Sequence, residues 1–218
     1  MSWNAALLRH EAVSALRGAA GWAFAPVFFL LFCTMSAFAM GSDRDFSTLG
    51  PALIWLAAIF SMLLAAQSIF RDDIENGFLD QLMVEDRSLA MALGARLFAR
   101  WLAITVMLLL ALPIAAAAFG LSWPVLAATG ISLVLGTPGA LLYAAAGASI
   151  STGARGAGEV LGPLIAGPLL TPVMIFGVGA AQSGAVFGAD AKALLAASLF
   201  AAAVCPPTCA AALRAANS

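Results

Sequence analysis

Six long apolar runs constrain the fold of this chain more than any other feature of its sequence. Each is close to the length of about 20 residues that an α-helix needs to cross the hydrocarbon core of a bilayer. Because a backbone in lipid must satisfy its own hydrogen bonds, such runs predict membrane-spanning helices. We therefore expect one all-α membrane domain over residues 1–218, with six transmembrane helices at residues 22–40, 49–70, 97–119, 123–150, 160–181 and 193–213.

The composition agrees with a polytopic membrane protein and argues against several other classes. Hydrophobic residues make up 63% of the chain and charged residues 10%, whereas about a quarter of the residues of soluble domains are charged. The sequence has no basic cluster, which argues against nucleic-acid binding. Its three cysteines, Cys33, Cys205 and Cys209, all fall in apolar runs, which favours small buried side chains over disulfides or a metal site.

Three of the apolar runs carry additional signals. Residues 22–40 are similar to a secretory signal, but their apolar run exceeds the usual 7 to 15 residues, so we interpret them as a retained span. Prolines in the fourth run predict a helix that is tilted or broken near residues 136–139. In the fifth run, Gly158, Gly162 and Ala166 follow small-xxx-small spacing, which favours close packing within the chain over self-association.

The basic residues predict the orientation. When the loops are assigned alternately to the two sides, eight arginines fall on one side, and Arg44 and Lys192 fall on the other. The positive-inside rule then places both termini in the cytoplasm. The segment at residues 1–21 is weakly amphipathic, and we interpret it as an interfacial helix lying on the membrane, with a flexible tail as the alternative.

Several kinds of chemistry are missing from the sequence. Lys192 is the only lysine and no phosphate-binding loop surrounds it, so the chain cannot bind ATP by that route. His10 is the only histidine and lies outside the spans, which excludes an intramembrane Ser-His protease or a HExxH metal site. Charges are scarce in the spans, so energy for any transport is expected to come from another protein.

One segment, Phe70–Arg87, is dense in charge and lies on the predicted cytoplasmic side, between the second and third spans. It holds six of the eleven acidic residues of the chain. Asp72 and Glu75 have the spacing of a capping box, which predicts that a new helix begins at Asp72. An apolar stripe at helical spacing follows, and it comprises Ile74, Phe78, Leu79, Leu82 and Met83, with Gly77 as a kink or a point of close approach.

Two functions fit this segment. The first is a solvated loop with an interfacial helix. The second is a short cytoplasmic coupling helix on which a soluble motor docks, since an apolar ridge flanked by carboxylates suits a groove with a few basic residues. Direct attachment to two spans would let motion of the motor move those spans.

A set of short stretches, together with the short N-terminal helix, is distinctive: Phe70–Asp73 followed by Gly77 and Leu79–Met83, then Leu135–Pro138, Arg155–Gly156 and Pro168–Gly177. With these stretches the chain resembles the CcmB family, also called haem exporter protein B, the membrane permease subunit of the cytochrome c maturation ABC complex. The resemblance covers most of the chain. Its most specific part is the FRDD stretch with its trailing glycine.

The resemblance implies a non-catalytic subunit in the bacterial inner membrane, surrounded by lipid. Its partners would be the ATPase CcmA, the haem-handling CcmC and the small CcmD, and the complex would use ATP to release the haem-loaded chaperone CcmE for periplasmic cytochrome c assembly. ATP would bind to the ATPase and haem to partner subunits, with no cofactor bound directly to this chain. Carried over position by position, the contact with CcmA comprises Phe70, Arg71, Asp72, Asp73, Ile74, Glu75, Gly77, Phe78, Leu79 and Leu82.

One departure from the family pattern follows the coupling segment. Family members usually have a proline-containing apolar turn after the QLM motif, whereas residues 84–88 are polar here and lack proline, so no role is carried over to Glu85 or Asp86. The scarcity of polar groups in the spans favours mechanical coupling over passage of haem. The alternatives are a haem exporter proper, a permease for an unrelated cargo and a passive scaffold. Two copies per complex are one option that the sequence leaves open.

Overall fold

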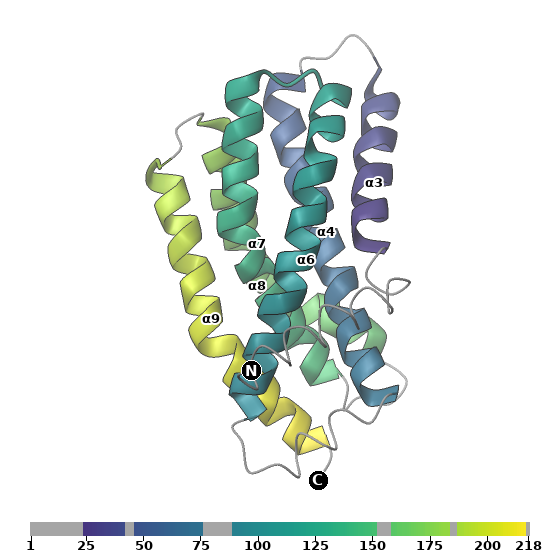
Figure 1. Ribbon diagram of the computed structural model, residues 1–218, viewed down its shortest axis with the longest axis vertical. Coiled ribbons are helices and arrows are strands. Elements are labelled where there is room, and N and C mark those ends of the chain that lie inside the picture. The colour runs from purple at the N-terminus through teal and green to yellow at the C-terminus, as the bar shows by residue number, and fades with distance from the viewer. Residues whose placement is uncertain (1–23, 42–45, 76–88, 152–157, 184–186, 217–218) are drawn as a thin grey trace, which may run out of the picture.

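The computed structural model describes residues 24–41, 46–75, 89–151, 158–183 and 187–216. These residues form an elongated bundle of helices (Figure 1). The helices are α3 (Phe24–Met40), α4 (Phe46–Glu75), α6 (Leu89–Ala118), α7 (Trp123–Ser151), α8 (Gly158–Gln182) and α9 (Ala189–Ala216). The predicted all-α fold class is confirmed. The predicted interfacial helix at residues 1–21 lies outside the described residues.

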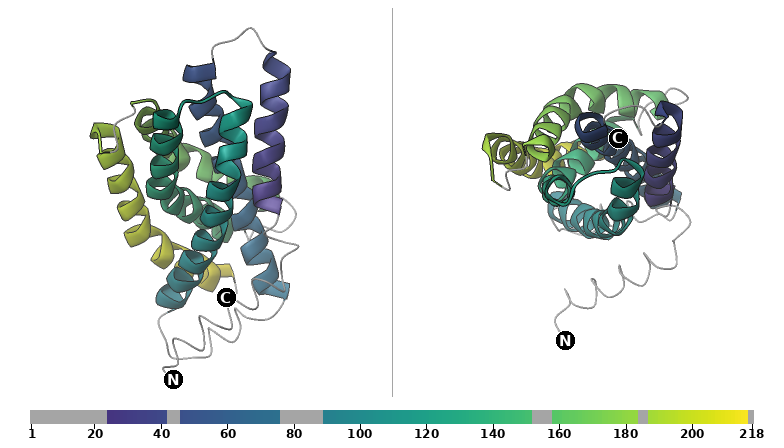
Figure 2. Two further views of the ribbon diagram at one scale, coloured as in Figure 1. Left: turned by 45° about the horizontal axis from the view of Figure 1, so that its top comes forward. Right: turned by 90° about the horizontal axis from the view of Figure 1, so that it is seen from above.

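Successive helices run in opposite directions along the bundle (Figures 1 and 2). The end at the bottom of Figure 1, called the lower end here, carries the last residues of α4 and α9 and the first residues of α6. Arg71 and Arg214 belong to the last two turns of α4 and α9, and Lys192 belongs to the first turn of α9, at the upper end. The alternation used to predict the orientation is therefore present, and the cytoplasmic assignment of the lower end stays a prediction.

Five of the helices are long and apolar enough to cross a membrane, namely α4, α6, α7, α8 and α9. They coincide with the second to sixth predicted spans. Helix α3 lies in the first predicted span and is apolar, but its 17 residues extend only about 25 Å at 1.5 Å per residue. The chain is thus a multi-pass membrane protein, and the count of six spans stays a prediction.

Helix α7 was expected to be tilted or broken near residues 136–139. It is not broken at its internal proline, so the expectation of a break is wrong, while a tilt in the membrane stays a prediction. The helix runs without interruption from Trp123 to Ser151. Pro138 has no amide hydrogen to donate to the carbonyl of Val134, four residues earlier. The two neighbouring carbonyls accept hydrogen bonds from hydroxyl groups: Thr137 donates to Leu133, and Ser198 of α9 donates to Leu135, each at 2.7 Å. These bonds hold the helix where the ladder is interrupted.

Helix α6 begins eight residues earlier than the third span was expected to begin, at Leu89 instead of residue 97. Leu89, Leu93 and Leu97 are each 2% exposed and recur every fourth residue, so they form one apolar stripe that packs on the bundle. Burial of this stripe extends the helix beyond the most hydrophobic part of the run.

The turn between α6 and α7 explains where α6 ends. Gly120 has a φ of +61°, a left-handed conformation that glycine adopts without steric cost. The amide of Gly120 donates to the carbonyl of Ala117 and the amide of Leu121 donates to that of Ala116. This pattern is a Schellman motif, which satisfies the last carbonyls of the helix.

Small residues bring α7 and α8 into close contact. A Cβ added to Gly162 of α8 would lie 3.1 Å from Ser151 Oγ and 3.4 Å from Ala148 Cα of α7. A Cβ added to Gly147 of α7 would in turn overlap the carbonyl oxygen of Gly162 and lie 3.1 Å from the Cβ of Ala166. Packing within the chain, favoured for the small-xxx-small motif, is therefore confirmed at Gly162 and Ala166. The surroundings of Gly158, the first residue of α8, are not described by the structure.

This contact generates a stability prediction. Gly147→Ala forces a methyl group onto the carbonyl of Gly162, and such overpacking costs about 1–3 kcal/mol. We expect a lower thermal unfolding midpoint for the full-length protein in detergent. Gly130→Ala on the same helix is the control, because its methyl group would meet only Leu112 at 3.4 Å and Leu109 at 3.9 Å. Equal midpoints for the two variants would contradict the tight α7–α8 contact.

Candidate functional site

The first part of the predicted coupling segment belongs to α4. The residues Phe70 to Glu75 continue this helix without a break, so the prediction that a new helix begins at Asp72 is wrong. The reason is local: residues 67–75 contain no glycine or proline, and the backbone hydrogen bonds of a helix do not stop where its apolar run stops. Gly77, Phe78, Leu79 and Leu82 lie outside the described residues, as does the rest of the predicted coupling helix.

At the opposite half of α4, Trp55 forms the centre of the bundle. Its side chain is fully buried. The indole Nε1 donates a hydrogen bond of 3.0 Å to Ser132 Oγ of α7, and the Ser132 hydroxyl donates to the carbonyl of Thr129 at 2.8 Å. Both polar groups are thus satisfied, which a buried indole and a buried hydroxyl require in a membrane interior.

Two glycines make room for the Trp55 ring. A Cβ added to Gly136 of α7 would lie 2.5 Å from Trp55 Cη2, and one added to Gly177 of α8 would lie 2.5 Å from Trp55 Cε2. Real Cβ atoms do not approach other atoms so closely. The indole therefore fits against bare backbone on both α7 and α8, and any side chain at either position would displace it.

Helix α9 reaches the same place. An added Cβ at Gly136 would also lie 2.7 Å from Leu194 Cδ1 of α9, and Leu194 is fully buried. Four helices, α4, α7, α8 and α9, consequently meet around one tryptophan and one glycine. We call Trp55, Ser132, Gly136, Gly177 and Leu194 the tryptophan junction.

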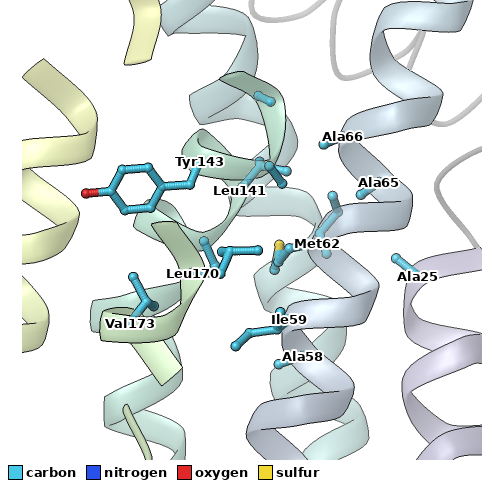
Figure 3. Packing of buried hydrophobic residues seen from close by; sticks show 14 of the residues in the cluster. Ala25, Ala58, Ile59, Met62, Ala65, Ala66, Leu141, Tyr143, Leu170 and Val173 are labelled. Carbon is cyan, nitrogen blue, oxygen red and sulfur yellow. The ribbon is translucent and has the colours of Figure 1, made fainter. Parts of the chain in front are cut away.

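The packing continues below the tryptophan junction toward the predicted coupling segment. Figure 3 shows Met62 of α4, Leu141 of α7 and Leu170 of α8 directed into one space. These side chains belong to the same buried cluster as Ala65, Ala66 and Ile69 of α4. Ile69 is only 2% exposed, so α4 is packed against the bundle up to the residue before Phe70.

Other contacts fix α4 at its upper end and against α3. Gln182 Nε2 at the end of α8 donates to the carbonyl of Thr48 at 2.8 Å. The Ser61 hydroxyl lies 3.0 Å from the carbonyl of Ala25 on α3 and 2.8 Å from that of Ala57 on its own helix. Contacts at three levels therefore hold α4 as one element.

Helix α6 is attached to α7 in a similar way. Trp101 Nε1 donates to Thr137 Oγ1 at 2.9 Å, and Thr105 Oγ1 lies 3.1 Å from the same oxygen. Two indoles, from α4 and α6, thus bind hydroxyls on α7 that are five residues apart. Because α7 also contacts α8 and α9, it is the neighbour that these helices share.

The buried polar groups of the described residues form hydrogen bonds within and between helices. Among the described residues, the buried serines and threonines are Ser61, Thr105, Thr129, Ser132, Thr137, Ser149 and Ser198. Arg96 and Arg100 of α6, which are only partly buried, each place their Nε atom inside the bundle. The serine and threonine side chains form hydrogen bonds with helix carbonyls, with one another and with the two indoles. Such a network positions helices. The tryptophan junction is thus a mechanical link between α4 and the rest of the bundle.

The sequence did not predict the tryptophan junction. Gly136 and Gly177 fall in two of the stretches that carry the family resemblance, and a glycine in the middle of an apolar span often permits close approach by another group. The two glycines could therefore have been singled out from the sequence, but the residue spacing along any one helix does not show that Trp55 is the group that approaches both of them.

Comparison with known proteins gives a consistent result. The sequence matches the family described as CcmB protein over residues 3–216. It is 34% identical over 219 residues to heme exporter protein B of Bradyrhizobium diazoefficiens, an alignment that covers 98% of both chains. It is 35% identical to the protein of the same name from Pseudomonas aeruginosa, over 81% of this chain and 79% of that one. The Paracoccus denitrificans protein is also 35% identical, over 85% and 84%.

The tryptophan junction generates a prediction with a control on the same helix. Gly177→Ala places a methyl group inside the Trp55 ring position, and we expect the unfolding midpoint of the detergent-solubilised protein to fall by the equivalent of about 1–3 kcal/mol. Gly167→Ala on α8 meets no atom within 4 Å and should leave stability unchanged or slightly higher, since alanine favours helix.

A double variant separates the contact from a general intolerance of alanine at residue 177. In a Trp55→Leu background the ring is absent, so Gly177→Ala should cost much less than it does in the native protein. Additive effects of the two substitutions would show that Trp55 does not occupy the space above Gly177.

Proposed function

The chain belongs to the CcmB protein family, and from this premise we propose that it is the non-catalytic permease subunit of an ABC complex in the bacterial inner membrane. It couples ATP hydrolysis by the partner ATPase CcmA to release of the haem-loaded chaperone CcmE in the periplasm. CcmC, which handles the haem, and the small CcmD complete the complex. Both termini, and the lower end of the bundle, face the cytoplasm.

The observation that carries this proposal is the continuity of α4. One uninterrupted helix contains Trp55 in its upper half and the acidic residues Asp72, Asp73 and Glu75 at its lower end. The 20 residues from Trp55 to Glu75 extend about 30 Å. A helix packed along most of this length moves as a unit, so a displacement at its end reaches the tryptophan junction.

The contact with the ATPase is proposed at the lower end of α4 and in the segment that follows. Phe70, Arg71, Asp72, Asp73, Ile74 and Glu75 lie on the last turns of α4, and the contact continues through Gly77, Phe78, Leu79 and Leu82. Three carboxylates within four residues complement a basic surface on the partner. Their attachment to α4 supplies the route by which the motion of the ATPase enters the membrane domain.

Export of haem through this chain is the second candidate, because the relatives named above carry the name heme exporter protein B. A pathway for an anionic porphyrin needs polar or basic lining. The fully buried polar side chains of the described residues are uncharged, and the arginines with buried Nε atoms, Arg96 and Arg100, lie in the lower half of α6. Trp55 fills the space between α4, α7 and α8. Mechanical coupling is therefore the stronger proposal. ATP-dependent haem uptake into inverted vesicles containing this chain and CcmA would favour export instead.

Deletion of the gene for this chain tests the assigned step. We expect covalent haem staining of the membranes to show loss of c-type cytochromes, while the chaperone on the same gel stays loaded with haem. That combination locates the defect at ATP-driven release. Normal c-type cytochromes in the deletion strain would overturn the link to cytochrome c maturation, and an unloaded chaperone would move the defect to an earlier step.

The stiffness of α4 is tested by a matched pair of variants at residues 67 and 68, between the tryptophan junction and the acidic end. Gln67→Gly with Ser68→Gly makes the helix flexible there, whereas Gln67→Ala with Ser68→Ala removes the same side chains and keeps it helical. The two differ by about 2 kcal/mol in helix preference. The flexible variant should bind CcmA normally and mature c-type cytochromes poorly, while the alanine variant should be close to native in both assays.

Charge reversal gives the complementary result. Asp72→Lys with Asp73→Lys should reduce recovery of CcmA in a pull-down without loss of membrane insertion. Unchanged recovery of CcmA would contradict the proposed ATPase contact at the end of α4.

For the variants at residues 67 and 68, equal maturation of c-type cytochromes with glycine and with alanine would show that a stiff α4 does not transmit the motion of the ATPase.

A further inference from the structure

Helix α8 carries two prolines on the face that it turns away from the bundle. Its buried residues Ala166, Leu170 and Val173 follow one another at three- and four-residue intervals on the packed side, whereas Pro168 and Pro172 are exposed. Seen from above, α8 lies at the rim of the bundle (Figure 2). Because α8 is long and apolar enough to cross a membrane, its outward face lies against lipid or against another membrane protein.

Each of these prolines leaves one backbone carbonyl of α8 without its helical donor. Pro168 has no amide hydrogen for the carbonyl of Leu164, and Pro172 has none for the carbonyl of Pro168. A helical amide points at the carbonyl four residues earlier, so each of these carbonyls lies beside an exposed proline ring. Leu164 is itself 68% exposed. The outward face of α8 thus presents two hydrogen-bond acceptors one turn apart.

Side chains do not supply the missing donors. Thr171, which is also exposed, donates its hydroxyl hydrogen to the carbonyl of Gly167 at 3.1 Å, and Ser183 donates to that of Ala180 at 3.0 Å. Within the part of the chain that the structure describes, these are the side chains that donate to carbonyls of α8. The surroundings of Pro138 in α7 are different, because hydroxyl groups there bind the carbonyls on both sides of the gap.

The membrane makes such acceptors costly to leave alone. The span within α8 is Leu161–Gln182, so residues 164–172 lie inside it. Lipid tails carry no donor, and a carbonyl surrounded by them bears the desolvation cost of a buried polar group. Membrane helices tolerate proline where a neighbouring helix, a hydroxyl group or water supplies a donor. The outward face of α8 is therefore suited to a neighbour that brings donors with it.

The number of donors distinguishes a second copy of this chain from a different protein. In a symmetric pair of α8 helices, each copy would present two carbonyls and a single hydroxyl group on this face, that of Thr171, which already donates to Gly167. Self-pairing would leave at least one carbonyl of each copy without a donor. A helix of a different protein can carry two donors at the spacing of one turn.

We propose that the outward face of α8 binds a transmembrane helix of a different protein, whose side chains donate hydrogen bonds to the carbonyls of Leu164 and Pro168. Suitable donors are serine or threonine hydroxyls, asparagine or glutamine amides and tryptophan indoles, placed three or four residues apart so that they lie on one side of their helix. At Gly167 an added Cβ would meet no atom within 4 Å, so the partner can approach the backbone there. This inference needs α8 to span the membrane and does not depend on the ATPase contact proposed above.

Site-specific photocrosslinking of the full-length chain in native membranes tests the proposal. The probe is p-benzoylphenylalanine in place of Leu164 or, separately, of Ile175, which is 62% exposed on the same face. Adducts are located by mass spectrometry of the cross-linked peptides. We expect both positions to label a membrane-spanning segment of one other protein, with two donor side chains three or four residues apart. Adducts with lipid alone, or with this chain alone, would overturn the proposal.

Restoring the missing amides tests the role of the carbonyls. Pro168→Ala with Pro172→Ala gives each carbonyl a donor within α8, so the protein adducts at residue 175 should fall by about fivefold or more. Pro168→Val with Pro172→Val restores the same amides with side chains as bulky as proline, and it should lower the adducts as much. Pro113→Ala is the control, because Pro113 is an exposed proline on α6, and it should leave the adducts unchanged.

Unfolding midpoints in detergent, measured in parallel, show that the variants fold. Both double variants should be at least as stable as the native chain, because each gains two helical hydrogen bonds. Adducts that persist in both double variants would overturn the proposal. So would adducts that are lost with alanine and kept with valine, since the bulk of the proline rings, and not the missing amides, would then account for the contact.

Discussion

The fit of the Trp55 indole against bare backbone on α7 and α8 is the contact on which the arrangement of this bundle depends. In lipid the helices gain nothing from excluding water, so packing and hydrogen bonds must hold them. A buried hydrogen bond between membrane helices contributes about 0.6 kcal/mol on average, whereas a methyl group forced into a filled space costs about 1–3 kcal/mol. The shape of the space at Gly136 and Gly177 therefore matters more than the bond from Trp55 to Ser132.

That fit also determines how the lower end of α4 relates to the remaining helices. The tryptophan junction joins α4 to α7, α8 and α9, and the bond of Trp101 to Thr137 adds α6 to the same neighbour, α7. If α4 is displaced along or across its axis, either α7 moves with it or the Trp55 indole loses its contacts with Gly136 and Gly177. The acidic end of α4 is continuous with this assembly. A small movement at Asp72 thus acts on most of the bundle, and not on α4 alone.

Hydropathy predicted the spans well where lipid alone determines the sequence, and poorly at their ends. The fourth and fifth spans, expected at residues 123–150 and 160–181, are helical over Trp123–Ser151 and Gly158–Gln182. The extensions of α4 to Glu75 and of α6 back to Leu89 were missed because helical hydrogen bonding and the leucine stripe continue beyond the apolar run. The capping-box spacing of Asp72 and Glu75 was misleading, since the same residues are compatible with the interior of a helix. The contacts of Trp55 with Gly136 and Gly177 were not predicted, because the rotation of each helix about its own axis depends on all of its neighbours together.

The same contacts bear on where a cargo would cross the membrane. Opening a path between α4, α7 and α8 would require the Trp55 ring to leave two glycines and its hydrogen bond, and the fully buried polar side chains of the described residues carry no charge for a porphyrin carboxylate. A groove between α6 and α9 is lined mainly by apolar side chains, and the donors of Trp101 and Ser198 in its lining are already hydrogen-bonded to α7. That groove suits hydrocarbon and not an anion. Under the proposed mechanical coupling, haem does not pass between these helices.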